Sequence, residues 1–390
     1  MIDATPMPGH PIAWAMVGGG QDSQIGPVHR SAAQRDHGLQ LVAGAFDIDP
    51  VRGRQFGERL GLDAQRCYAD YRAMFEAEAR RPDGIRAVSI ATPNNTHFEI
   101  CRAALLAGLH VVCEKPLCFT TAEALQLLEL SRASRRIVGV AYGYAGHQLM
   151  EQAREMVAQG ELGEIRIVQM QFSHGFHSEA VEAASAAARW RMDPAHAGPS
   201  YVLGDLGTHP LYLSQLVLPG LEIERLMCSR QSFIGSRAPL EDNALALMQY
   251  RGGAMGYLWA CAVNSGSMHG QRLRVIGSKA SLEWWDEHPN QLRHEIQGRP
   301  AQVLDRGMDY LHPAARQEDR IGAGHAEGLF EAWANLYRRF ALAMHATDRG
   351  DSLALGKIRY PDIQAGVEGV RWVENCVRSA DAGGVWIDYR

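Results

Sequence analysis

Residues 85–116 constrain the fold more than any other segment, because they predict a strand, a helix and a second strand in direct succession. The segment opens on an apolar run, after which Thr96 and Glu99 have the spacing of a helix capping box. An apolar helical face follows, Gly108 suits the residue after a helix, and "HVVC" at 110–113 forms the next apolar run. Two strands joined by a helix pair in parallel, so we expect a parallel sheet.

The same alternation of strands and helices extends over the first 145 residues. Further apolar runs with the character of strands lie at 12–17, 39–47 and 137–144. Pro27 suits the first position of a helix because it has no N–H to satisfy, and Thr120 with Glu123 repeats the capping-box spacing. Helices then cover both faces of the sheet, and ligands bind outside the carboxyl ends of its strands.

The pattern changes after residue 146. A helix at 147–160 leads into longer alternating runs at 164–174, 222–233, 243–263 and 272–285, and helical patterns return at 324–346 and 361–380. A chain of 390 residues is long enough for two domains. We therefore predict the α/β class, with an NAD(P)-binding Rossmann domain at 1–145 and an α+β domain at 146–390. The second domain is built on a large, mainly antiparallel open sheet.

Composition narrows the class of function. The net charge is -5 and charges of both signs are mixed along the chain, so no basic stripe offers itself to nucleic acid or to an anionic membrane. The seven cysteines contain no CxxC pair, which is typical of reduced thiols in a cytoplasm. We find no signal segment and no apolar run of roughly 18 residues, so we expect a cytoplasmic protein that acts on a small molecule.

The segment "MVGGGQDSQIGPVHR" follows the first strand and resembles a dinucleotide-binding turn. Gly18 and Gly20 fit the first two glycines of GxGxxG, but Gly26 comes three residues late, after Gln24 and Ile25. From the residues alone, a methyltransferase that binds its nucleoside cofactor at a similar loop remains open.

Asp47, at the end of the second strand, suits a ribose 2′-hydroxyl and would repel a 2′-phosphate. The residue therefore favours NAD, with NADP as the alternative because Arg52 and Arg54 lie near it in the sequence. A turn or helix cap is the other interpretation of Asp47.

Several motifs occur in a set order along nearly the whole chain. After the glycine turn come "TPNNTH" at 92–97, "EKP" at 114–116, "WRMDP" at 190–194, "GDLGTH" at 204–209 and "GHAEGLFEAWANLY" at 324–337. Together they resemble the glucose-fructose oxidoreductase and inositol dehydrogenase family (Gfo/Idh/MocA), and a subgroup with a lengthened "GGG...IG..HR" turn is most similar. The resemblance implies NAD(P)-dependent oxidation or reduction of a sugar, glycoside or cyclitol in a cleft between the domains. It also implies a homodimer or homotetramer assembled through the open sheet.

The resemblance assigns roles to individual residues. The catalytic residues it implies are Lys115, Asp205 and His209. The cofactor-binding residues are Gly18, Gly20, Gln24, Ile25, Asp47, Thr92, Pro93, Asn94, His97, Glu114, Lys115, Trp190 and Arg191. One departure lies before the aspartate, where Pro199 and Ser200 replace the glycine pair that the family often has.

The chemistry of alcohol oxidation suits these residue types. A base must take the hydroxyl proton while hydride leaves the carbon, and the imidazole of His209 accepts protons near neutral pH. On a helix beginning near Leu206, Asp205 would share a face with His209, and Pro210 would fall in the first turn. Lys115 can stabilise the developing alkoxide. A second assignment makes Lys115 the base and His209 its orienting partner.

Two other functions remain open. One is a non-catalytic NAD-binding sensor or partner protein, and the other is a metal-dependent hydrolase. For the latter, His174 and His177 could join Asp205 and His209 around a metal. We predict no metal site, because no HExxH motif or thiolate cluster is present.

Overall fold

The computed structural model describes residue 7 and residues 9–390. Packing divides the chain into two compact units. The N-terminal unit comprises the described residues up to Gly143 together with Trp333–Val370, and the sheet unit comprises Tyr144–Ala332 with Arg371–Arg390. Residues 333–370, which the sequence analysis assigned to the second domain, thus pack in the N-terminal unit. The domain boundary at 145 stays a prediction.

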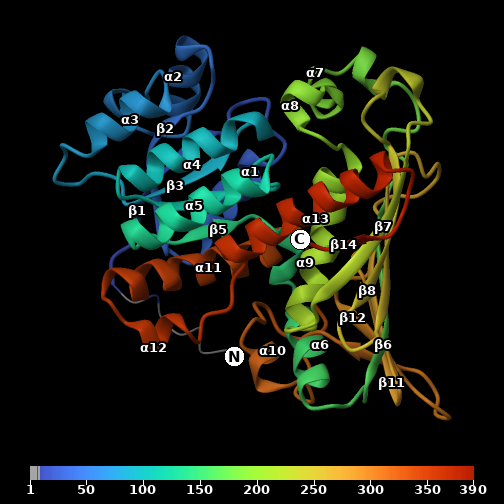
Figure 1. Ribbon diagram of the computed structural model, residues 1–390. Coiled ribbons are helices and arrows are strands. Elements are labelled where there is room, and N and C mark those ends of the chain that lie inside the picture. Colours follow the sequence, from blue (N-terminus) through green and yellow to red (C-terminus); the bar gives the residue numbers. More distant parts are fainter. Residues whose placement is uncertain (1–6, 8) are drawn as a thin grey trace. The chain divides into compact units, whose positions relative to one another are not determined.

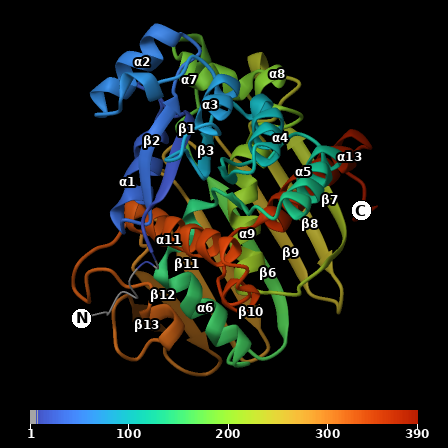
Figure 2. The same cartoon turned by 90° about the vertical axis from the view of Figure 1, so that its left-hand side faces the viewer.

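The N-terminal unit contains a five-stranded sheet in the order β2-β1-β3-β4-β5, and every pair is parallel. Its strands are β1 (Ile12–Gly18), β2 (Leu39–Ala45), β3 (Ala87–Ala91), β4 (His110–Cys113) and β5 (Val138–Val140). The helices are α1 (Gly26–Arg35), α2 (Pro50–Arg59), α3 (Tyr71–Glu78), α4 (His97–Leu106), α5 (Thr121–Ser134), most of α11 (Leu329–Asp348), α12 (Ser352–Leu355) and the first half of α13 (Ile363–Asp381). Helices α4 and α5 lie side by side (Figures 1 and 2). The predicted parallel sheet is confirmed.

Local signals place most helix ends correctly. Pro27 lies in the first turn of α1, and Thr120 and Glu123 form the predicted capping box of α5. The capping box predicted at Thr96 is wrong, because that side chain accepts no hydrogen bond from the first turn of α4. Its hydroxyl instead donates to the Pro93 carbonyl at 2.8 Å and lies within hydrogen-bond distance, 2.6 Å, of Thr92 Oγ1. A nearby acceptor in the preceding loop competes with the cap.

The sheet unit contains nine strands in the order β13-β12-β11-β10-β6-β9-β8-β7-β14. They are β6 (Ile165–Ser173), β7 (Ile223–Gln231), β8 (Asn243–Tyr250), β9 (Met255–Cys261), β10 (Gln271–Gly277), β11 (Ala280–Trp285), β12 (Gln291–Ile296), β13 (Gln302–Asp305) and β14 (Ile387–Asp388). Every pair is antiparallel except β6 with β9. This arrangement confirms the predicted, mainly antiparallel sheet.

Helices cover one face of this sheet. Helices α6 (Gln148–Ala158) and α9 (Thr208–Val217) lie against it (Figure 1). The other helices of the unit are α7 (Ala186–Arg189), α8 (Pro194–Ala197), α10 (Pro313–Arg316) and the second half of α13 (Ile363–Asp381). Side chains of β8 alternate between buried and exposed, as a sheet with one covered face requires. Within the described residues, no helix is long and apolar enough to cross a membrane.

Candidate active site

In the glycine turn between β1 and α1, the backbone packs so closely against neighbouring backbone that side chains have no room. Gly18 and Gly19 have positive φ angles of 74° and 67°. A Cβ at Gly18 would lie 2.5 Å from the Ala91 carbonyl oxygen, and one at Gly26 would lie 2.2 Å from that of Gly19. Gly20 is restricted in the same way by Phe46. The turn therefore needs four glycines, including Gly19, which the motif search did not single out.

The extra residues of the turn form a loop that leads directly into α1. Gln24 and Ile25 precede the helix, and Ser23 Oγ accepts a hydrogen bond from Gly26 N at 3.0 Å. Arg30 donates from α1 to the Gly19 carbonyl at 2.6 Å. The bare backbone and the N-terminus of a ten-residue helix fit the pyrophosphate of a dinucleotide.

Asp47 follows β2 and makes the turn contact that was its other interpretation, together with an ion pair to Arg52. Its carboxylate accepts from Asp49 N at 2.9 Å and pairs with Arg52 at 2.8 Å. Burial alone would raise the pKa of Asp47, but the bonds from Arg52 and from backbone N–H groups, together with the charge of Arg52, outweigh burial and lower it. The carboxylate is therefore ionised at neutral pH, and Asp49 N and Arg52 occupy part of its hydrogen-bonding capacity. It retains acceptor capacity for a ribose hydroxyl, since a carboxylate offers about four lone-pair sites.

His97 ties together the two loops that follow β3 and β4. Nδ1 lies 2.8 Å from the Pro116 carbonyl oxygen, and Nε2 lies 2.9 Å from that of Thr92. The ring is fully buried, and burial lowers its pKa although both carbonyls favour the charged form. His97 thus holds the loops that carry Thr92, Pro93, Asn94 and Lys115, rather than presenting its own ring at their surface.

Glu114 and Lys115 directly follow β4 at the carboxyl edge of the sheet. Glu114 is buried, and its Oε1 lies 3.0 Å from His29 Nε2. Its Oε2 accepts from the Lys115 backbone N–H at 3.2 Å. His29 in turn contacts the Tyr337 hydroxyl at 2.5 Å. These linked contacts fix the backbone that presents the half-buried Lys115.

In the sheet unit, Asp205 and His209 lie on one continuous helical segment, which differs from the predicted one. Helix α9 begins at Thr208, two residues after the predicted start near Leu206. A π-helical turn, Leu203–Gly207, precedes α9 and contains Asp205. The Thr208 N–H reaches the Leu203 carbonyl, as the wide turn requires. Pro210 falls in the first turn of α9, as predicted, and the π-turn that precedes it is a feature frequent at functional sites.

The segment "WRMDP", which the sequence analysis assigned to the cofactor, reaches Asp205 in the structure. Arg191 Nε lies 3.6 Å from Asp205 Oδ2, and both side chains are partly exposed. The Arg191 guanidinium also lies 4.5 Å from the centre of the Trp190 ring. Trp190, Arg191 and Asp205 therefore belong to one cluster.

Ser200, one of the two departures from the family pattern, supports this helical segment. Its Oγ accepts from Leu203 N at 3.2 Å and donates to the buried carboxylate of Glu241. Burial raises the pKa of Glu241, although Ser200 and Arg230 oppose the shift. The serine thus caps the start of the segment that carries the predicted catalytic pair.

Aromatic and histidine rings surround His209. Its ring centre lies 4.9 Å from that of Tyr144 and 5.9 Å from that of Phe172. His269 lies 4.5 Å from Phe172, and the Tyr144 hydroxyl lies 3.1 Å from His269 Nε2. Sequence reasoning missed Tyr144, Phe172 and His269, because no motif or spacing connects them.

His174 and His177 lie beside the same cluster. Burial lowers the pKa of His174 to about 4 and also lowers that of His177, with Asp205 opposing both shifts. His177 Nδ1 contacts the hydroxyl of Tyr201, another residue that the sequence analysis missed. No three His, Cys, Asp or Glu side chains in the described part of the chain are arranged to hold a metal ion.

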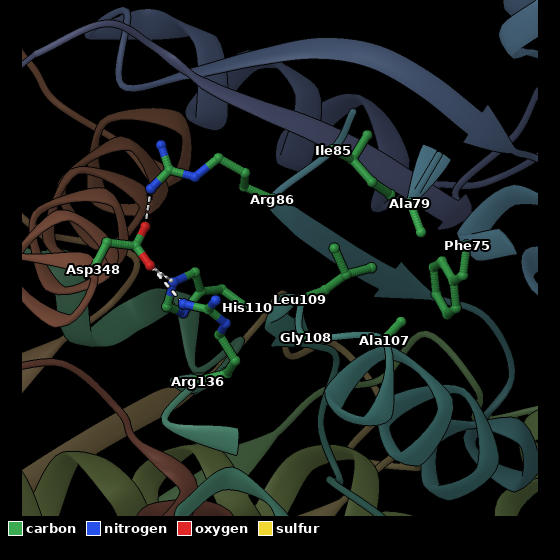
Figure 3. A pocket seen from close by; sticks show the side chains of 10 residues that line it. All are labelled: Phe75, Ala79, Ile85, Arg86, Ala107, Gly108, Leu109, His110, Arg136 and Asp348. Atoms are coloured by element: carbon green, nitrogen blue, oxygen red, sulfur yellow. Dashed lines mark hydrogen bonds and ion pairs between the residues drawn. The ribbon is translucent and has the colours of Figure 1, made fainter. Parts of the chain in front are cut away.

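A separate pocket lies at the opposite edge of the parallel sheet from Lys115. It has a volume of about 100 Å³, and Asp348 of α11 contacts Arg86, His110 and Arg136 there (Figure 3). Arg86 precedes β3 and His110 begins β4, so these are the amino ends of the strands. Ligands of such sheets bind at the carboxyl ends, and we assign this pocket a structural role.

Two family descriptions match the chain. Residues 12–142 match "Oxidoreductase family, NAD-binding Rossmann fold", and residues 154–388 match "Oxidoreductase family, C-terminal alpha/beta domain". These matches confirm the predicted NAD-binding fold and the α/β character of the second part.

Relatives match over the full chain. "Uncharacterized oxidoreductase YfiI" of Bacillus subtilis (strain 168) is 55% identical over 392 residues, which cover 100% of both chains. A solved inositol dehydrogenase homolog complexed with NAD+ from Azotobacter vinelandii is 71% identical over 100% of both chains, with a TM-score of 0.99. A structure of an inositol dehydrogenase homolog from the same organism, complexed with NADH and myo-inositol, is 71% identical. It matches over 97% of this chain and 98% of that one, with a TM-score of 0.94.

Proposed function

This chain belongs to the Gfo/Idh/MocA family of oxidoreductases, and on that premise we propose that it is an NAD-dependent dehydrogenase of cyclitols, with myo-inositol as the representative substrate. The observation that carries the proposal is the 71% identity to the inositol dehydrogenase homolog that was solved with NADH and myo-inositol. Oxidoreductase activity follows from the family, and the substrate and the residue roles are our inference.

The residues of the N-terminal unit fit NAD. Gly18, Gly19, Gly20 and Gly26 leave the backbone of the turn bare for a pyrophosphate, and Asp47 stands at the end of β2 for the adenosine ribose. Bound NAD supplies the nicotinamide that accepts hydride from the substrate carbon. Thr92, Pro93 and Asn94 follow β3 beside the turn, where we assign them to the cofactor.

His209 is the proposed base, and the chemistry of its surroundings supports the assignment. It takes the proton from the substrate hydroxyl as the carbon is oxidised. Asp205, one helical turn earlier and paired with Arg191, orients the substrate or the imidazole through its carboxylate. Lys115 donates a hydrogen bond to the same oxygen and stabilises its negative charge. The alternative assignment exchanges the roles of Lys115 and His209.

We also propose that the enzyme is a homodimer or homotetramer assembled through the uncovered face of the nine-stranded sheet. Ile167, Leu245, Leu247, Met255 and Tyr257 are each 37 to 46% exposed. They occupy neighbouring positions on β6, β8 and β9. A contiguous apolar patch of this kind is typical of a protein–protein interface.

The experiment is a substrate panel. Purified protein is incubated with NAD and, separately, with myo-inositol, other cyclitols, hexoses and glycosides, while formation of reduced nicotinamide is followed by absorbance. We expect the highest kcat/KM with a cyclitol. Turnover of only open hexoses would overturn the substrate assignment, and tight NAD binding without turnover of any polyol would favour the sensor function instead.

A further inference from the structure

Three residues from separate segments of the sheet unit form a hydrogen-bonded chain, and the last of them packs its ring against that of His209. Asp286 follows β11, His269 precedes β10, and Tyr144 lies in the turn before α6. His269 Nδ1 contacts Asp286 Oδ2, and His269 Nε2 lies 3.1 Å from the Tyr144 hydroxyl. The Tyr144 ring then meets the His209 ring edge-on, with 4.9 Å between their centres and 84° between their planes.

The first member of the chain is firmly held. The Asp286 side chain is 7% exposed, and its Oδ1 accepts from Gln271 N at 3.2 Å. The backbone of His269 donates to Glu287 Oε1 at 3.1 Å. Because both ends of the Asp286–His269 pair are anchored to β10 and its neighbouring turn, the imidazole of His269 has little freedom to turn.

The carboxylate also determines which ring nitrogen of His269 carries the proton. A carboxylate accepts and does not donate, so Nδ1 is protonated and Nε2 of the neutral ring is left to accept from the Tyr144 hydroxyl. The hydrogen bond between His269 Nε2 and the Tyr144 hydroxyl holds the tyrosine ring in one orientation. Phe172, which contacts His209, His269 and Tyr144, closes the cluster.

We propose that Asp286, His269 and Tyr144 are positioning residues that orient the imidazole of His209 for proton removal from the substrate. The inference rests on the proposed role of His209 as base. It explains why a tyrosine with a hydroxyl, and not a phenylalanine, packs against this histidine. A base misaligned with its proton loses rate even when its substrate still binds.

The kinetic test compares Y144F, H269Q and the double variant Y144F/H269Q, using NAD and myo-inositol. We expect each single change to lower kcat by about three- to tenfold, the usual value of one hydrogen bond, and to leave KM within about twofold. The kcat of the double variant should be no lower than that of the less active single variant, because both changes remove the same hydrogen bond. Y310F and H288Q are matched controls, since both residues lie outside the cluster.

Two outcomes would overturn the proposal. If the losses in kcat of the two single variants multiply in the double variant, Tyr144 and His269 act independently. If KM rises in H269Q while kcat stays constant, His269 is a substrate contact.

A second measurement does not depend on turnover. In protein with ¹⁵N-labelled histidine, the signals of His269, identified by their absence in H269Q, should show a protonated Nδ1 that changes in D286N. An unprotonated Nδ1 would refute the chain. If the wild-type protein oxidises no polyol, the proposed function fails, and this NMR result still decides whether the chain exists.

Discussion

The Nε2 atom of buried His29 lies 3.0 Å from Oε1 of Glu114, and this contact joins the helix after the glycine turn to the end of the strand that presents Lys115. Both residues belong to motifs that the sequence analysis treated separately. The second oxygen of Glu114 holds the Lys115 backbone at 3.2 Å. The cofactor-binding turn and the lysine are therefore coupled through one carboxylate.

Replacing Glu114 with glutamine should weaken this coupling. An amide has one acceptor oxygen where the carboxylate has two, so it can hold both the Lys115 N–H and His29 only by donating its NH2 group to His29 Nε2, which forces the imidazole into the other tautomer. We expect the free energy of unfolding to fall by about 1–2 kcal/mol and kcat/KM to fall with it. Urea denaturation and steady-state kinetics measure the two effects. The exposed Glu99 provides the control E99Q, and equal stability of both variants would contradict this account.

Cofactor choice should depend on Asp47 and Arg52. D47A removes the charge that repels a 2′-phosphate and frees the Arg52 guanidinium, now 2.8 Å from Asp47, to bind that phosphate. We expect the ratio of kcat/KM for NAD to that for NADP to fall by about tenfold or more. The double variant D47A/R52A should lose the gain for NADP. A ratio unchanged in D47A would show that Asp47 acts only as a turn cap.

Sequence patterns predicted strands β6 to β11 because these follow from local periodicity, whereas β12, β13 and β14 were not predicted. Thr120 and Glu123 cap α5 as expected, since both partners lie in the same turn. The prediction at Thr96 was wrong because its hydroxyl finds Thr92 and Pro93 in the loop before the helix. The start of α9 near Leu206 was predicted to within two residues, but the π-turn before it was not, because a π-turn has no sequence signature strong enough to predict.

The ring cluster around His209 could not be predicted for a different reason. Tyr144 and His269 are separated by 125 residues, and their contact depends on how β10 pairs with β6 in the nine-stranded sheet. Single aromatic or histidine residues carry no spacing signal, and only the tertiary fold brings them together. The links between His29 and Glu114 and between Ser200 and Glu241 escaped prediction for the same reason.

The cluster in Figure 3 should make stability sensitive to acid. Burial would raise the pKa of Asp348, but its bond with His110 and the charges of His110, Arg86 and Arg136 lower it well below the usual range. Burial lowers the pKa of His110. Both groups bind more protons when unfolded, so stability should fall as pH drops below about 6.5 for His110 and below about 3.9 for Asp348.

The change D348N tests this relationship. At neutral pH the variant should be less stable by about 1 kcal/mol, because three cationic or donor groups lose their acceptor charge. The difference between D348N and wild type should shrink as the pH falls toward the region where Asp348 is protonated. Thermal unfolding over a pH series measures both quantities, and a constant difference at all pH values would contradict the assignment.

Subunit assembly should be sensitive to charge on the uncovered sheet face. Leu247 and Tyr257 are partners across β8 and β9, and both are more than one third exposed. Y257E would bring like charges together in a symmetric interface and should shift the protein toward monomer in sedimentation experiments. The control L125E adds the same charge on exposed α5. An unchanged oligomeric state in Y257E would exclude this face as the interface.

Turnover of myo-inositol by K115M and H209N, measured beside NAD affinity for the same proteins, tests the central claim most directly. The account predicts that each variant loses about 100-fold or more in kcat while its NAD dissociation constant stays within about threefold of wild type. The control K357M should retain full activity, since Lys357 is exposed and outside the proposed site. Undiminished turnover in either K115M or H209N would contradict the proposed chemistry.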